Sequence, residues 1–217
     1  MRQTTDVSRR ALVKGALALG ASAVIVGGVT APRRALASGE SPAVDGANAD
    51  VQYGFLVYAS KCVNCEKCVA ACRQGNGLSD DTPDRRRITV VSNDKGGELS
   101  VSTSCMHCAQ PSCERVWPAG AISKGSHGIV SVDTDRCIGC KYCYQACPYD
   151  VPRYNTVAMD KCDCCLGAGV APGETPYCVS ACIFNALKYG PLEELKEQEP
   201  DAVVIASIND PSCLVRG

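Results

Sequence analysis

The chain has 217 residues, of which 17 are cysteine, and its 22 basic and 23 acidic side chains give a formal net charge of -1. Only two phenylalanines and one tryptophan are present, so we expect disulfides or bound metal to support a thin apolar core. Residues 38–217 carry 16 basic and 22 acidic side chains, and this net charge of -6 excludes an electrostatic basis for binding nucleic acid.

Residues 1–37 are predicted to be an export signal. Arg9 and Arg10 precede an uncharged run, residues 15–32, and the small-x-small triplet at residues 35–37 suits a signal peptidase. The segment resembles twin-arginine signals, which implies export of an already folded protein to the periplasm or the outer face of the cytoplasmic membrane. A membrane anchor is the alternative, but four glycines make the run weakly apolar. Residues 38–50 are predicted to be a linker.

Fifteen of the cysteines fall into four segments, here called loops 1 to 4. Loops 1 and 3 have the spacing C-x2-C-x2-C-x3-C, and loop 2 has C-x2-C-x4-C. Two pairs separated by twelve residues make up loop 4. The cysteines are Cys62, Cys65, Cys68 and Cys72 in loop 1; Cys105, Cys108 and Cys113 in loop 2; Cys137, Cys140, Cys143 and Cys147 in loop 3; and Cys162, Cys165, Cys178 and Cys182 in loop 4. Cys164 and Cys213 are left over.

This spacing favours iron–sulfur clusters. Three closely spaced thiolates can wrap one cluster while the fourth cysteine reaches another, as in two-cluster ferredoxins. Cysteines two residues apart in one tight loop are poorly placed to form a disulfide with each other, which disfavours a disulfide scaffold. Zinc is the stronger rival, but a zinc site uses two C-x2-C pairs and has no use for a triplet.

Longer matches point to one family. The segments "CMHC", "PAGAI", "GIVSVD", "CIGCKYCYQACPYDVPRY", "DKCDCC" and "ALKYG" lie between Tyr53 and Gly190. In order and spacing they resemble the four-cluster ferredoxin subunits of the molybdopterin oxidoreductases, the dimethyl sulfoxide reductase superfamily. The resemblance is strongest to the exported iron–sulfur subunits of formate-dependent nitrite reductase systems.

The resemblance implies which cysteines bind each cluster. In this family loops 1 and 4 share two clusters, and loops 2 and 3 share the other two. Carried over, the ligands are Cys62, Cys65, Cys68 and Cys182 for cluster 1; Cys72, Cys162, Cys165 and Cys178 for cluster 2; Cys105, Cys108, Cys113 and Cys147 for cluster 3; and Cys137, Cys140 and Cys143 for cluster 4.

Trp117 stands where the fourth ligand of cluster 4 is expected. An indole offers a donor N–H and no thiolate. We therefore expect three 4Fe–4S clusters and one 3Fe–4S cluster, or a 4Fe–4S cluster with a labile corner iron. The alternatives are that Trp117 only packs while a nearby residue or water completes the site, or that Cys164 or Cys213 substitutes.

The expected fold is α+β, with tandem bacterial-ferredoxin-like (dicluster) lobes in residues 51–190. Lobe A holds residues 62–72 and 162–182, and lobe B holds residues 105–118 and 137–148. Short strands are predicted at "YGFLVY", "GIVSVD" and "ALKYG", with an inserted β-hairpin between loops 1 and 2. A surface helix and tail are expected over residues 191–217, with little other regular structure outside the cluster loops.

The motifs predict electron transfer without catalysis. No Ser-His-Asp set, dinucleotide fingerprint or phosphate loop is present, and His107 in "CMHC" is expected to tune or shield a cluster without being one of its ligands. The resemblance implies a molybdopterin-containing catalytic subunit and a membrane quinone-reactive or cytochrome subunit as partners. The rival function is a stand-alone enzyme that uses an open iron of cluster 4 as a Lewis acid.

Overall fold

The computed structural model describes residues 51–92, 96–116, 118–156 and 158–217. The predicted export signal and linker, as well as Trp117, lie outside these residues. Within the described ranges, no helix combines the length and the apolar character that crossing a bilayer requires.

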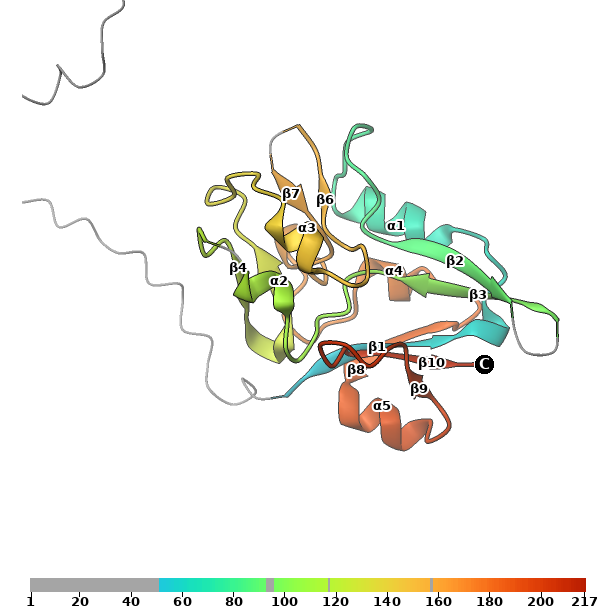
Figure 1. Cartoon of the computed structure of the whole chain (residues 1–217). Helices are drawn as coiled ribbons and strands as arrows, with labels where there is room; N and C mark the ends of the chain where they lie inside the picture. The colour runs from blue at the N-terminus through green and yellow to red at the C-terminus, as the bar shows by residue number, and fades with distance from the viewer. Residues whose placement is uncertain (1–50, 93–95, 117, 157) are drawn as a thin grey trace, which may run out of the picture. The chain divides into compact units, whose positions relative to one another are not determined.

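A four-stranded sheet gathers segments that are far apart in the sequence (Figure 1). The predicted strand "YGFLVY" is β1 (Tyr53–Tyr58), which pairs antiparallel with β8 (Leu187–Pro191). On its other side β1 pairs parallel with β10 (Cys213–Arg216), and β9 (Val203–Val204) completes the sheet at the far edge. Almost every β1 residue is buried, as expected for a central strand with both faces covered.

One face of the sheet packs against α5 (Leu192–Gln198). Leu56 and Tyr58 of β1 point to this face together with Leu214, and Leu195 of α5 completes the cluster. In Figure 1 the helix lies below the sheet, on the side away from the helices that carry cysteines. Its packing leaves the opposite face of the sheet for the cysteine loops.

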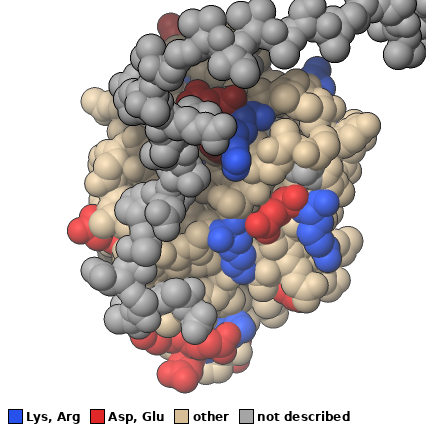
Figure 2. Space-filling model, turned by 90° about the vertical axis from the view of Figure 1, so that its left-hand side faces the viewer, with Lys and Arg blue, Asp and Glu red and all other residues tan. Residues whose placement is uncertain are grey.

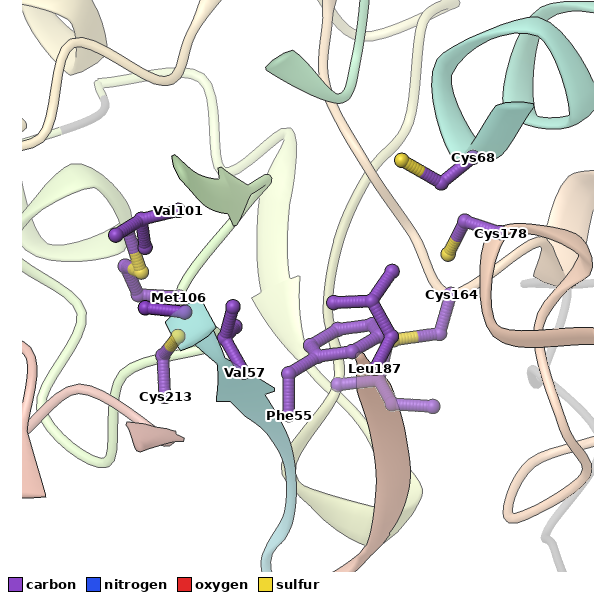
Figure 3. Packing of buried hydrophobic residues seen from close by; sticks show 11 residues of the cluster. Phe55, Val57, Cys68, Val101, Met106, Cys164, Cys178, Leu187 and Cys213 are labelled. Atoms are coloured by element: carbon purple, nitrogen blue, oxygen red, sulfur yellow. The ribbon is translucent and has the colours of Figure 1, made fainter. Parts of the chain in front are cut away.

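The alternate residues of β1 face the cysteines. Phe55 and Val57 belong to a core cluster that also contains Met106 and the thiols of Cys68 and Cys178 (Figure 3). The period-two alternation of a strand therefore separates an ordinary apolar core from a sulfur-rich one.

The C-terminal tail differs from the sequence prediction. A surface helix and tail are expected over residues 191–217, but this is wrong for β10, which lies inside the sheet with Leu214 only 1% exposed. Four residues are too few to show a clear periodicity. The strand is buried because of its pairing with β1, a partner far away in sequence.

The remaining elements are short. Two further strands, β2 (Arg87–Ser92) and β3 (Glu98–Thr103), pair antiparallel where the sequence predicts a hairpin. Small two-stranded sheets join β4 (Ile122–Lys124) to β5 (Val130–Val132) and β6 (Arg153–Tyr154) to β7 (Met159–Asp160). The other helices are α1 (Lys67–Gly75), α2 (Ser112–Arg115), α3 (Tyr142–Ala146) and α4 (Tyr177–Ser180), and three 3-10 turns lie at Ala59–Lys61, Ser126–Gly128 and Leu166–Ala168.

On the face drawn in Figure 2, acidic and basic side chains alternate and no extended basic patch is visible. The visible part of this face therefore lacks the concentrated positive charge that non-specific binding to phosphate backbones needs.

Gly75 sets how closely α1 and α4 approach. A Cβ atom there would lie 2.2 Å from the Cδ2 atom of Tyr177 in α4. We expect Gly75→Ala to force the two helices apart and to lower the free energy of unfolding by about 1–3 kcal/mol, as overpacked cores do. Urea unfolding of anaerobically prepared protein, followed by circular dichroism, measures this change. Gly190→Ala is the matched control, because a Cβ atom there meets nothing within 4 Å, and equal midpoints for both variants would contradict the packing argument.

Candidate metal centres

Loops 1 and 3 turn with the same backbone conformation. Asn64 and Glu66 of loop 1 have φ values of 54° and 57°, and Gly139 and Lys141 of loop 3 have values of 67° and 63°. In each loop these two residues flank the second cysteine, and a helix begins directly afterwards, α1 or α3. Successive left- and right-handed residues form the concave backbone that often surrounds an iron–sulfur cluster.

Loops 2 and 4 also share a local design. The helices α2 and α4 each have four residues, begin after a proline, Pro111 or Pro176, and carry a cysteine, Cys113 or Cys178, at their second position. Helix α4 packs on α1, and α2 packs on α3. The cysteines of loop 4 therefore meet those of loop 1, and the cysteines of loop 2 meet those of loop 3.

The first converging set of thiols, group 1, surrounds one pocket beside α1. Burial raises the pKa of Cys62, and the sulfur atoms of Cys65, Cys68 and Cys182 raise it further. The backbone N–H of Ala186 donates to one sulfur at 3.3 Å, and the hydroxyl of Ser102 lies 3.4 Å from another. Group 1 consists of Cys62, Cys65, Cys68 and Cys182.

Group 2 is buried between α1, α4 and the start of loop 4. Burial raises the pKa of Cys72, and the other thiols of the group add to this shift. The side-chain amide of Asn76 donates to the Cys72 carbonyl at 2.8 Å and lies 3.5 Å from the sulfur of Cys165. Group 2 consists of Cys72, Cys162, Cys165 and Cys178.

Group 3 lines a second pocket, together with Lys161 and Tyr149. Burial raises the pKa values of Cys108 and Cys113 to about 12, and nearby thiols of the same group contribute to both shifts. Group 3 consists of Cys105, Cys108, Cys113 and Cys147.

Group 4 contains only three thiols, Cys137, Cys140 and Cys143. Burial raises the pKa of Cys143, and the other two thiols of the group raise it as well. The phenol oxygen of Tyr154 lies 3.0 Å from the Cys143 sulfur, and the N–H of Met159 donates to the Cys137 sulfur at 3.4 Å. Because Trp117 is outside the described residues, its place beside this group stays a prediction.

The helices connect neighbouring groups. Cys68 of group 1 and Cys72 of group 2 lie one turn apart on α1. Cys143 of group 4 is in α3, and Cys147 of group 3 directly follows the last residue of this helix. Groups 1 and 2, and likewise groups 3 and 4, are therefore held at close range by the spacing of cysteines on a helix.

His107 lies where groups 2 and 3 meet. Its buried ring accepts a hydrogen bond from the N–H of Val130 at Nδ1, 3.0 Å away. Burial alone would lower the pKa of His107, but the adjacent sulfur atoms of Cys105 and Cys162 raise it. His107 thus lies beside sulfur atoms of two groups, and its role in tuning or shielding a cluster stays a prediction.

The two leftover cysteines do not join group 4. Cys164 is buried at the edge of group 2, with its sulfur 3.3 Å from Nε2 of His107. The ligand atoms of His107, Cys162 and Cys164 lie within 4.8 Å of one another, so this metal-competent triad overlaps group 2. Cys213 lies in β10 beside Met106, apart from the cysteines of α1 and α4 in Figure 3.

Sequence reasoning missed two buried cations. It singled out neither Arg86, which is 1% exposed, nor Lys161, next to a loop 4 cysteine, which is 4% exposed. The available signal was strand parity, because Arg86 lies two residues before Ile88, which packs against the sulfur-rich core.

The donor sets fit iron–sulfur clusters. Groups 1 to 3 each offer four sulfur atoms and group 4 offers three, and in each group burial raises the pKa of at least one thiol. Two thiols differ: the charges of His107 and Lys161 lower the pKa of Cys105 despite its burial, and a hydrogen bond from Cys164 together with His107 lowers that of Cys162. Several thiolates can coexist in so small a space only if positive charge neutralises them. Thiolate-bound iron–sulfur clusters provide that charge, and sulfur is the donor they use.

Cys213 is a buried thiol outside the four groups, so its replacement tests whether only the grouped thiols bind iron. Cys213→Ala should leave the iron content of the protein unchanged and lower the stability by about 1 kcal/mol, the order expected for one small buried group. Cys178→Ala, which removes a group 2 sulfur, should reduce iron and acid-labile sulfide. Chemical analysis of anaerobically purified variants measures both, and loss of iron from Cys213→Ala would contradict the grouping.

Comparisons with known proteins agree with this geometry. The family model described as "4Fe-4S dicluster domain" matches residues 98–192. The chain is 38% identical over 169 residues to the B subunit of the anaerobic dimethyl sulfoxide reductase of Escherichia coli, covering 72% of this chain and 82% of that protein. It is 39% identical over 153 residues to the thiosulfate reductase electron transfer subunit PhsB of Salmonella typhi, covering 68% and 80%.

A third relative, protein NrfC of Escherichia coli, is 36% identical over 153 residues, covering 66% of this chain and 67% of that protein. The matched regions cover two thirds or more of the length of each of these three relatives. The chain belongs to the family of iron–sulfur electron-transfer subunits of molybdopterin oxidoreductases.

Proposed function

We propose that this chain binds four iron–sulfur clusters. Through them it relays electrons between a molybdopterin-containing catalytic subunit and a membrane quinone-reactive or cytochrome subunit of an anaerobic reductase. One observation carries the proposal: fifteen cysteines from four separate loops converge into four groups, and no other cofactor-binding motif accompanies them. The names of the relatives, which are subunits of dimethyl sulfoxide and thiosulfate reductases, support an electron-transfer role beside a catalytic partner.

Groups 1 to 4 are proposed as the protein ligands of clusters 1 to 4. The support is that each group gathers the thiols that the family resemblance assigns to one cluster, including the crossed cysteines Cys182, Cys72 and Cys147, which come from a different loop or helix end. Such exchange of the last cysteine is the pattern of two-cluster ferredoxins.

The same pattern favours two pseudo-symmetric lobes. Loops 1 and 3 share their left-handed residues, and loops 2 and 4 share the proline-started helix with cysteine at its second position. Lobe A then combines α1 with α4, and lobe B combines α3 with α2. The β2–β3 hairpin is proposed as an insertion between the lobes.

The clusters supply one-electron redox chemistry when bound. The chain's own contribution is to hold thiolates in fixed groups, to exclude water and to donate hydrogen bonds to sulfur. The N–H groups of Ala186 and Met159 and the amide of Asn76 serve this last role. Hydrogen bonds to sulfur, burial and net charge are the terms by which a protein sets cluster potentials.

Cluster 4 is proposed to hold three irons, or four with one labile. The support is that group 4 has three thiols, and both leftover cysteines lie with other groups or in the core. The tyrosine hydroxyl nearest this group, Tyr154, is hydrogen-bonded to a ligand sulfur. A site with three thiols leaves the fourth iron of the cluster without a cysteine ligand, although loop 3 keeps its full cysteine spacing.

Replacing Trp117 tests this assignment. Trp117→Cys should add one iron per chain and convert the EPR signal of an oxidised three-iron cluster into that of a reduced four-iron cluster. Val116→Cys, which places an exposed thiol one residue earlier, is the control and should keep the three-iron signal. Four intact cubanes in the wild-type protein would disprove the three-iron assignment.

The chain is further proposed to perform no bond chemistry of its own. The isolated subunit, given a reduced viologen dye and either dimethyl sulfoxide or thiosulfate, should show no sustained dye oxidation. Oxidation should stop after a few electrons per chain, since only the clusters can accept them. Continuous dye oxidation without a second subunit would contradict this proposal, because it would mean that the chain itself reduces the added substrate.

Residues 1–37 are proposed as a twin-arginine export signal, which would place the folded chain in the periplasm or on the outer face of the membrane. The paired Arg9 and Arg10 before a glycine-rich uncharged run support this proposal.

A further inference from the structure

Arg86 is a buried positive charge without an acidic partner. Its guanidinium donates to the Ser102 carbonyl at 3.2 Å, to the Ser102 hydroxyl at 3.1 Å and to the Ser104 hydroxyl at 2.9 Å. It stacks over the Phe55 ring at 4.8 Å. Among the described residues it forms no salt bridge, and its Nε atom has no hydrogen-bond partner.

The neighbouring Arg85 is neutralised in the usual way, by carboxylate groups. Its guanidinium pairs with Asp160 at 2.8 Å and with Asp163 at 3.1 Å. Arg86 has only neutral hydroxyls and a carbonyl, although it is the more deeply buried of the two. An arginine stays protonated even when it is buried. Because no carboxylate pairs with Arg86, its charge requires another anion nearby.

The groups that face Arg86 are sulfur atoms. Burial alone would lower the pKa of Arg86, but Cys178, Cys162, Cys68 and Cys72 lie close enough to raise it. Cys68 belongs to group 1, and the other three belong to group 2. Arg86 therefore lies between two proposed clusters.

A hydrogen-bonded bridge joins Arg86 to group 1. The Ser102 hydroxyl accepts from the guanidinium at 3.1 Å and lies 3.4 Å from the Cys68 sulfur. When Cys68 is a thiolate ligand, this hydroxyl can only donate to it. The positive charge thus polarises a hydrogen bond that ends on a ligand sulfur.

We infer that Arg86 is the internal counter-charge of clusters 1 and 2 and raises the reduction potentials of both. The inference rests on the proposed cluster ligation. A reduced cluster carries one more negative charge than its oxidised form, and a fixed positive charge nearby stabilises the reduced form more. Because the site is buried, solvent screens this interaction only weakly.

A purely structural role is the competing explanation. Arg86 also ties Ser102 and Ser104 of the β3 end to the segment before β2, so its loss could disturb the hairpin alone. Two substitutions separate charge from shape. Arg86→Gln removes the charge and keeps some hydrogen bonding, whereas Arg86→Lys keeps the charge and loses the planar fork.

The experiment uses the full chain purified anaerobically, with iron and sulfide counted per chain and the cluster potentials fitted from EPR-monitored redox titrations. In Arg86→Gln, two of the fitted potentials should fall. At a fixed potential, the reduced-to-oxidised ratio of each should drop about tenfold, which corresponds to about 59 mV for a one-electron couple. For the other clusters of Arg86→Gln, and for every cluster of Arg86→Lys, the reduced-to-oxidised ratio should change by less than about threefold.

Arg87→Gln is the matched control. This neighbouring arginine donates to the backbone carbonyls of Tyr149 and Asp150, and its bond to Asp150 is exposed to solvent. Loss of its charge should leave every potential within the same threefold limit.

The outcomes decide between the explanations. Unchanged potentials in an iron-replete Arg86→Gln protein, or equal shifts in Arg86→Gln and Arg86→Lys, would overturn the inference. If Arg86→Gln loses iron, the lysine variant decides: retained iron supports a charge requirement, and equal loss refutes it. A wild-type chain without iron would instead refute the proposed function, so the two failures are distinguishable.

Discussion

Thiolates that share a small buried volume repel one another, and this repulsion is the constraint on which the rest of the structure depends. In the described chain, burial and neighbouring sulfurs raise the pKa values of Cys62, Cys72 and Cys108. The polypeptide alone thus favours protonated thiols in these positions. Bound iron reverses the preference, so cofactor insertion and the final packing of the loops are energetically coupled.

The sheet makes this coupling possible because it holds the loops on a framework whose other face is stabilised by apolar packing alone. Strand β1 presents Leu56 and Tyr58 to α5, which forms an apolar core without cysteine ligands. Its alternate residues, Phe55 and Val57, contact the sulfur-rich core instead. A chain with few aromatic residues can therefore fold around inorganic groups while one side of the sheet is stabilised by ordinary burial.

Local sequence patterns predicted the parts of the structure that depend on neighbours in the chain. Cysteine spacing indicated the loops, and alternation indicated the strand Tyr53–Tyr58. Long-range pairing was beyond such patterns: Cys213–Arg216 lies inside the sheet only because β1 pairs with it. The burial of Arg86 was missed for a related reason, since a run of three arginines looks solvated until the partners of each side chain are known. Trp117 is the opposite case, where a single substitution in a recognisable motif predicts a change in chemistry that the fold does not reveal.

Arg85 and Arg86 show how the same residue type serves two electrostatic purposes at adjacent positions. Arg85 is neutralised by Asp160 and Asp163, so its charge contributes mainly to holding loop 4 against the segment before β2. Arg86 is surrounded by hydroxyls and thiols, so its field acts on the cysteine groups. Both residues lie in the bend that precedes β2, and adjacent positions in this bend separate a structural ion pair from a charge directed at the metal sites. Residues 38–217 carry a net charge of -6, which would on its own oppose adding electrons to the clusters, and a buried cation next to the ligands offsets that opposition where it acts most strongly.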